Sequence, residues 1–149
     1  MKIREATIND IDEIHSLGNT VNEFSVSDEV VIFWPKHILH NCIKSQTDYL
    51  LIAKEKEKII GFIIINNSLV FKKTIIENIY ILPQFRKKGF GTKLLNMAIK
   101  KIKTTGCEYI CLLTNNYEAI KFYESNSFEK GKDFVWLDKV LSKKFSLKI

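Results

Sequence analysis

The segment 79–92 places the strongest constraint on how this chain folds. It is an apolar, β-branched run that ends at Pro83, followed by Arg86, then Gly89 and Gly91, and then a helical pattern. Proline cannot donate to a strand ladder, so the strand is expected to stop there. Glycine lacks a Cβ, so the backbone at 89 and 91 can turn tightly and approach a ligand closely.

This order predicts an anion site at a helix N-terminus. The amides of the turn and the first unpaired amides of the helix converge on one point, which carries the positive end of the helix dipole. Arg86, Lys87 and Lys88 add positive charge, although such a cluster is also typical of solvated surface. The two common nucleotide signatures, Gly-x-Gly-x-x-Gly and Gly-Lys-Ser/Thr, do not occur in this segment.

An Arg-x-x-Gly-x-Gly loop between a strand and a helix resembles the acetyl-CoA loop of the GNAT N-acetyltransferase superfamily. The resemblance implies that the loop holds the diphosphate of coenzyme A, while the pantetheine arm runs along the preceding strand. It also implies a bulge that opens a cleft between Leu82 and Thr114. The cofactor-binding residues implied here are Ile79, Tyr80, Ile81, Arg86, Lys87, Lys88, Gly89, Phe90, Gly91 and Thr92.

A second pattern, which begins at Asn116, is similar to the family's Asn-x-x-Ala-x-x-Phe-Tyr-x-x-x-Gly-Phe motif. Asn116 is expected to cap a helix and to bond a ligand amide. Ala119 and Phe122 are implied cofactor contacts, and the resemblance implies that Tyr123 protonates the departing thiolate. Taken alone, Tyr123 also suits a buried aromatic residue. Ser127 replaces the usual glycine, so an unusual φ is expected there.

Glu77 is the candidate general base. An amine is mostly ammonium at neutral pH, and only its free base attacks a thioester. Glu77 shares strand parity with the isoleucines that follow it, and some polyamine-acetylating members of the family have their proposed base at the matching offset. The alternative is an ion pair with a lysine such as Lys73. Asn78, on the opposite face by parity, and His37 and His40 are weaker candidates.

The pattern of elements predicts one α/β domain over residues 1–149, with a mixed sheet in the GNAT-like order β-α-α-β-β-β-α-β-α-β-β. Residues 18–34 are ambiguous between a second amphipathic helix and the floor of a substrate pocket. Strands are expected at 2–6, 49–54, 59–65, 74–82, 107–114, 128–130 and 134–141, and helices after Thr7, after Pro35, at 91–103 and at 116–125.

Composition narrows the class of protein further. No apolar run reaches bilayer length and the first residues do not form a signal peptide, so a cytoplasmic protein without membrane association is expected. Cys42, Cys107 and Cys111 lack the paired spacing of a zinc site, so no metal is expected. The net charge of +6 comes from scattered lysines without interleaved aromatics, which disfavours nucleic-acid binding.

The function predicted from these patterns is transfer of an acetyl group from acetyl-CoA to a primary amine by direct attack. The expected acceptor is a small amine or a polyamine-like molecule, with a protein N-terminus or lysine as the alternative. A non-catalytic acyl-CoA-binding module is the alternative from another class. The expected partners are acetyl-CoA and the amine, and a homodimer is one possible assembly.

Overall fold

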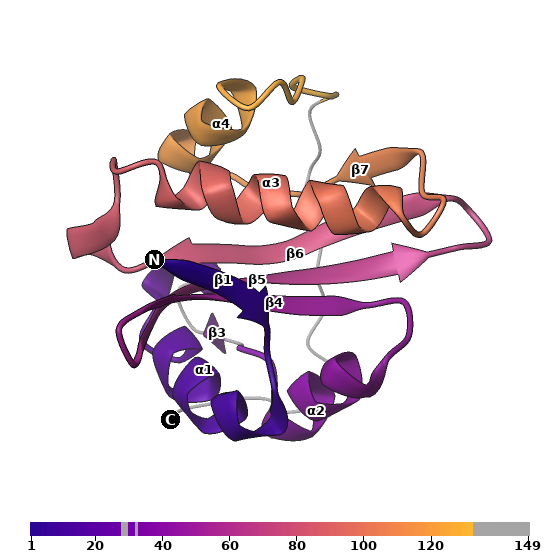
Figure 1. Ribbon diagram of the computed structural model, residues 1–149. Helices are drawn as coiled ribbons and strands as arrows, with labels where there is room; N and C mark the ends of the chain where they lie inside the picture. The colour runs from indigo at the N-terminus through magenta and orange to yellow at the C-terminus, as the bar shows by residue number, and fades with distance from the viewer. Residues whose placement is uncertain (28–29, 32, 133–149) are drawn as a thin grey trace.

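A computed structural model describes residues 1–27, 30–31 and 33–132. Five strands form one sheet in which all neighbouring pairs are antiparallel except the last, which is parallel. Their order across the sheet is β1 (Lys2–Glu5), β4 (Tyr49–Glu55), β5 (Lys58–Ser68), β6 (Lys73–Ile81) and β7 (Tyr109–Cys111). The expected mixed α/β sheet is therefore confirmed (Figure 1).

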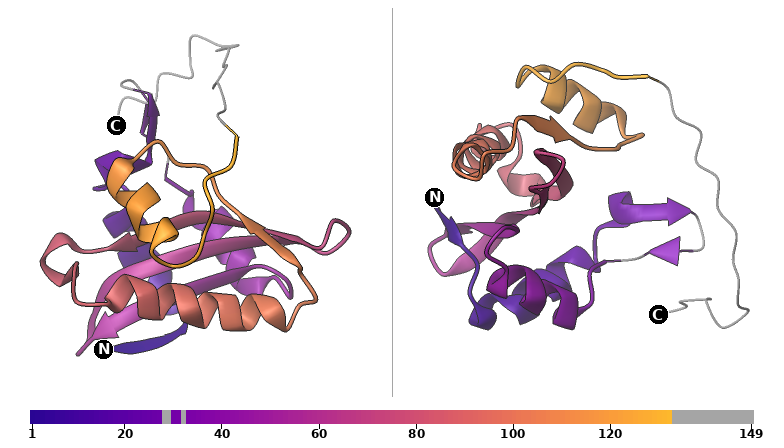
Figure 2. Two further views of the ribbon diagram at one scale, coloured as in Figure 1. Left: turned by 90° about the horizontal axis from the view of Figure 1, so that it is seen from above. Right: turned by 90° about the vertical axis from the view of Figure 1, so that its right-hand side faces the viewer.

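Helices cover both faces of this sheet, as the right-hand view of Figure 2 shows. One face is covered by α1 (Ile11–Gly18) and α2 (Lys36–Lys44), and the other by α3 (Phe90–Lys103) and α4 (Tyr117–Glu124). Short 3-10 turns lie at η1 (Ile8–Asp10), η2 (Asn22–Phe24) and η3 (Pro83–Phe85). None of the helices seen in the described ranges is long and apolar enough to cross a lipid bilayer.

The central strand β5 explains how two cores form on one sheet. Successive side chains of a strand point to opposite faces, and the run 59–65 is apolar at every position that carries a side chain. Phe62 and Ile64 accordingly pack in the core under α1 and α2, the α1-side core. Ile63 and Ile65 pack in the core under α3, the α3-side core. Continuous apolar strands are the expected result when both faces are covered.

Strand β6 contains a bulge at Glu77. Ile64 of β5 lies opposite Asn78, and the next residue of β5, Ile65, lies opposite Ile76, so Glu77 is the extra residue. The bulge breaks the strict alternation of side chains on which the expected parity of Glu77 rested. That expectation is therefore wrong, and the reason is local backbone geometry that a period-two pattern does not encode.

Strands β6 and β7 separate just before the bulge. Their parallel pairing covers only Lys73 to Ile75 on β6, although β6 continues to Ile81. Strand β7 is also shorter than the expected 107–114, because the chain leaves the sheet after Cys111. The edge of β6 from 76 to 81 is thereby left without a neighbouring strand within the described residues.

Two other expectations differ from the structure. In the ambiguous segment 18–34, the described residues form η2 and a small hairpin of β2 (Ser25–Ser27) and β3 (Val30–Val31), instead of a second amphipathic helix. Residues 128–130 are not a strand. The expected strand 134–141 lies outside the described residues.

The start of the first helical segment confirms the predicted cap. Thr7 and Asp10 form a capping box, in which the Asp10 carboxylate accepts from the amide of Thr7 at 2.7 Å and from its hydroxyl at 2.8 Å. Arg4 on β1 donates two hydrogen bonds to the same carboxylate, at 2.7 and 2.8 Å. The hydrogen bonds from the Arg4 guanidinium hold the pKa of the buried Asp10 carboxyl well below its usual range.

We predict that Asp10→Asn lowers the free energy of unfolding by about 2 kcal/mol at pH 7, because a buried group that accepts from Arg4 loses its charge. Since the folded-state pKa of Asp10 is depressed, the stability it contributes is present above the unfolded pKa of about 4 and is lost as pH falls toward the folded pKa. Urea unfolding from pH 7 to pH 2.5 should therefore show the difference between the two proteins shrinking below pH 4. A constant difference over this range would contradict the assignment.

Candidate active site

The exposed edge of β6 presents backbone groups of alternate residues. The amide of Leu82 donates to the carbonyl of Ile60 at 2.8 Å, toward β5. In an antiparallel pair the backbone groups of alternate residues point to opposite edges, so those of Ile81 and Ile79 point away from β5. They face the space from which β7 has diverged. An extended ligand can therefore hydrogen-bond to this edge as an added strand would.

The glycine loop leads from the end of this edge into α3. Gly89 is the N-cap residue with a left-handed φ of 75°, and no side chain caps the helix. A residue with a Cβ is strained at such a φ, so glycine suits this position. The first-turn amides of Phe90, Gly91 and Thr92 have no acceptor from an earlier turn. The local backbone therefore forms the anion-attracting helix start that the sequence predicts.

The basic residues of the loop differ in what they contact. The Nε of Arg86 donates to the carbonyl of Ile81 at 2.8 Å, and its guanidinium lies 5.2 Å from the ring centroid of Tyr80. The Nζ of Lys88 donates to the carbonyl of Gln84 at 3.0 Å. Arg86 thus binds the end of β6, while the exposed Lys87 and Lys88 supply positive charge around the loop.

The second glycine of the loop has a packing role that the sequence pattern did not indicate. A Cβ at Gly91 would lie 3.2 Å from Cε2 of Phe122 on α4, which is tighter than ordinary contact. The absence of a side chain at 91 therefore lets α3 and α4 approach closely. Phe122 and Ala119, both expected to contact the cofactor, pack on the α3-side core.

Asn116 caps α4 as predicted. Its Oδ1 accepts from the amide of Ala119 at 3.0 Å, and its own amide donates to the hydroxyl of Thr114 at 3.1 Å. At the other end of the helix, Ser127 has a φ of 67°, which confirms the unusual backbone expected where the family has glycine. Both ends of α4, and hence Tyr123, are fixed by local backbone contacts.

Tyr123 lies in the α3-side core with only 7% of its surface exposed. Its ring lies 5.2 Å from the centroids of both Phe122 and Phe128, in edge-on arrangements. Among the described residues no hydrogen bond reaches its hydroxyl. Burial raises the pKa of the phenol above its ordinary value, so Tyr123 stays protonated over the physiological pH range.

Glu77 is bound by an amide and not by a lysine in the described part of the chain. The Nδ2 of Asn66 on β5 donates to its Oε1 at 2.9 Å. Both neighbours of Asn66 on β5 face the α3 side of the sheet. Ile65 belongs to the α3-side core, and Asn67 contacts Cys107, which packs against that core. By alternation Asn66, and with it the Glu77 carboxylate, faces the side of α1 and α2.

Asn78, the residue after the bulge, faces the same side and accepts at 2.6 Å from the indole Nε1 of Trp34. Sequence reasoning considered Trp34 only as part of the ambiguous segment 18–34 and did not identify Asn66. The signal that could have identified Asn66 is a polar residue at the end of an otherwise apolar strand. The candidates His37 and His40 lie on α2, which packs on α1 and on β4.

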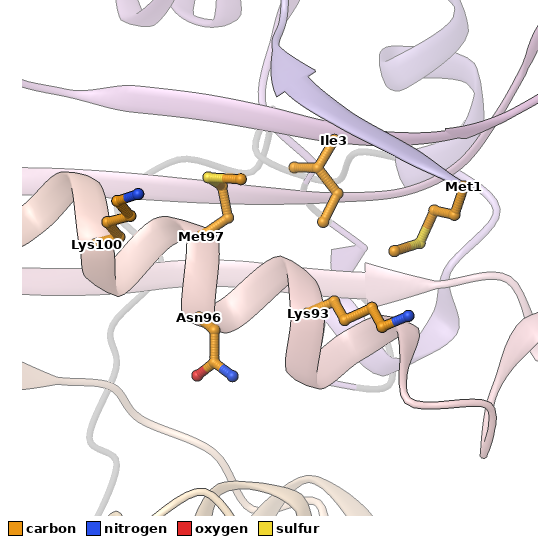
Figure 3. Close-up of a pocket in the computed structure, with 6 residues that line it drawn as sticks. All are labelled: Met1, Ile3, Lys93, Asn96, Met97 and Lys100. Carbon is orange, nitrogen blue, oxygen red and sulfur yellow. The ribbon is translucent and has the colours of Figure 1, made fainter.

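A separate open hollow of about 450 Å³ lies between β1 and α3 (Figure 3). It is at the opposite edge of the sheet from β7, because β1 and β7 are the two edge strands. None of the predicted site residues lines it. Its lining residues are Met1, Ile3, Lys93, Asn96, Met97 and Lys100.

Comparison with known proteins agrees with this architecture. The family model described as Acetyltransferase (GNAT) family matches residues 10–128. The chain is 29% identical over 143 residues to the uncharacterized N-acetyltransferase YhfO of Bacillus subtilis, covering 91% of this chain and 94% of that protein. It is 28% identical over 145 residues to an N-alpha-acetyltransferase of Sulfolobus acidocaldarius, covering 88% and 81%.

Among solved structures, the PaiA N-acetyltransferase of Thermoplasma acidophilum in complex with coenzyme A superimposes with a TM-score of 0.71 at 25% identity. The match covers 84% of this chain and 87% of that one. Together with the two motifs and the divergence of β6 from β7, these findings establish that the chain belongs to the GNAT family and is an acetyl-CoA-dependent N-acetyltransferase.

Proposed function

We propose that this enzyme acetylates a small primary amine by direct attack, with Glu77 as the general base and Tyr123 as the general acid. The observation that carries the proposal is the arrangement along β6. The bulge with Glu77, the open strand edge at Ile79 and at the amide of Ile81, and the start of α3, which no side chain caps, follow one another along one stretch of chain. A donor bound along this stretch has the base near one end and the anion site at the other.

The residues present fit acetyl-CoA. The amides of Phe90, Gly91 and Thr92 would hold the diphosphate, with Lys87 and Lys88 adding charge. The backbone of Ile79 would pair with the pantetheine amides, and Asn116, Ala119 and Phe122 would bound the arm on the α4 side. Bound there, acetyl-CoA would supply an activated acetyl thioester.

Three groups of this chain would act on the reaction. Glu77 would take a proton from the ammonium form of the acceptor, directly or through water. The amide of Ile81 points to the open edge and would donate to the oxygen on which negative charge develops. Tyr123, kept neutral by its buried position, would donate its proton to the leaving sulfur.

A protein N-terminus is the second candidate acceptor, and the relative named N-alpha-acetyltransferase favours it. We rank it second because that name belongs to a protein only 28% identical to this one. A non-catalytic acyl-CoA-binding module is disfavoured, since such a module has no need for a buried tyrosine whose hydroxyl has no partner among the described residues, in the same core as Ile81 of β6.

We predict that Thr92→Asp separates helix stability from cofactor affinity. A carboxylate in the first turn of α3 favours the helix dipole, so thermal stability should rise slightly, by about 0.5 kcal/mol. The same charge repels a diphosphate, so calorimetry should show coenzyme A affinity falling on the order of tenfold. Asn96→Asp, one turn further along and exposed, is the control that should keep its affinity. Equal affinities in both variants would contradict the proposed diphosphate site.

We predict that Tyr123→Phe lowers kcat about a hundredfold, because the general acid is lost while the ring remains. Thermal stability should not change, since no hydrogen bond to the hydroxyl exists within the described residues. Release of free coenzyme A thiol gives the rate, and calorimetry gives the cofactor affinity. Unchanged turnover would exclude the acid role.

For Glu77→Gln we expect kcat/KM to fall about a hundredfold at pH 7 and to recover toward pH 10, as the free amine accumulates without help from a base. The hydrogen bond from Asn66 can be kept by the glutamine oxygen, so folding should be preserved. Glu124→Gln, exposed on α4, serves as the control. A constant ratio of variant to wild-type rate over this pH range would show that Glu77 is not the base.

A further inference from the structure

The bulge in β6 turns two consecutive polar side chains, Glu77 and Asn78, toward the α1 and α2 side of the sheet. Each is tied to a partner from a different element, Glu77 to Asn66 on β5 and Asn78 to Trp34 before α2. Regular alternation would have sent one of the two to the opposite face. The side chains of Glu77 and Asn78 therefore project toward the same side of the sheet from adjacent residues, whose Cα atoms are about 3.8 Å apart.

The chemistry of the partners fixes the orientation of Asn78. An indole Nε1–H can only donate, so the oxygen of Asn78 must face Trp34 and its NH₂ must face elsewhere. Within the described residues this NH₂ has no hydrogen-bond partner, and Asn78 is partly exposed. Trp34 packs against the α1-side core, which restrains the indole.

Glu77 is left with one available oxygen by the same reasoning. A carboxylate only accepts, so the NH₂ of Asn66 faces Oε1, and Oε2 has no partner in the described part of the chain. Glu77, like Asn78, is partly exposed. The surface thus offers one acceptor, Oε2 of Glu77, next to one donor, Nδ2 of Asn78.

We propose that the acceptor substrate is an amine with a hydrogen-bond-accepting oxygen on the neighbouring carbon, that Asn78 selects this oxygen, and that Trp34 positions Asn78. The inference rests on the proposed function, because Glu77 must receive the amine for Asn78 to receive the oxygen. A 1,2-amino alcohol and the N-terminal residue of a peptide share this chemistry. A plain alkylamine or an unsubstituted polyamine lacks it and leaves the Nδ2 donor unpaired.

The test compares matched acceptors on the intact enzyme by thiol release at saturating acetyl-CoA. Propylamine and ethanolamine have the same number of non-hydrogen atoms, and the terminal methyl group of propylamine is replaced by a hydroxyl in ethanolamine. Glycinamide and a short peptide with a free N-terminus present a carbonyl oxygen instead. With rates expressed per concentration of free amine, wild-type kcat/KM should be about tenfold higher for the oxygen-bearing acceptors. The acceptor with the highest kcat/KM shows whether the oxygen belongs to an amino alcohol or to a peptide.

Trp34→Phe removes the indole donor and keeps an aromatic ring, which frees the Asn78 amide to turn. The ratio of kcat/KM for ethanolamine over propylamine should fall toward one, which a general loss of stability would not produce. Asn78→Leu should give the same collapse, and Trp34→Phe decides the outcome if that variant does not fold. Phe24→Leu changes an aromatic residue that packs against the same core as Trp34 but makes no hydrogen bond to Asn78, so this variant should keep the wild-type ratio.

The outcomes distinguish the two proposals. Wild-type enzyme that acetylates propylamine and ethanolamine equally well overturns the oxygen preference while the amine acetyltransferase proposal stands. Retention of the wild-type ratio in Trp34→Phe overturns the positioning role. Absence of thiol release with every amine and peptide overturns both.

Discussion

The site depends on one interruption of strand pairing. A regular sheet satisfies the backbone groups of its inner strands and leaves no room for a ligand between them. Here the extra residue at 77 bends β6, and β7 pairs with only its first three residues. Because the backbone of β6 then faces open space on one side, the fold carries unsatisfied donors and acceptors where an extended molecule can use them.

The same interruption brings together parts that come from distant segments. The bulge is on β6, the first-turn amides of α3 follow after the glycine loop, and Tyr123 comes from α4 into the core under α3. The bulge, the amides of α3 and Tyr123 do not depend on a large cluster of charged side chains. In the proposed cofactor site, backbone amides would provide most of the electrostatic attraction, and they keep their orientation without a cost in side-chain entropy.

The sequence predicts the elements whose signal is local. Pro83, the glycines and the apolar spacing of α3 locate the strand end, the turn and the helix, and Asn116 locates the start of α4, because each of these acts through its own backbone. The strongly apolar run of β5 likewise indicates a buried central strand. The family resemblance adds the order in which these elements pair.

What the sequence could not supply is non-local. The bulge depends on how β5 and β6 align, so parity placed Glu77 on the wrong face. The contacts of Asn66 with Glu77 and of Trp34 with Asn78 join residues 11 and 44 positions apart, and no pattern along the chain marks them. The segment 18–34 has no clean period, so its hairpin was missed, and residues 128–130 have strand-like composition without a strand.

The close contact between Gly91 and Phe122 has a consequence for how this enzyme can change over evolutionary time. The ring of Phe122, the neighbour of the buried tyrosine, fills the space that a side chain at Gly91, the second residue of α3, would need. A larger side chain at 91 would require a smaller one at 122, and that exchange would loosen the wall against which Tyr123 rests. Substitutions at position 91 of the first motif are therefore sterically coupled to substitutions at position 122 of the second, and the two positions should covary as the protein evolves.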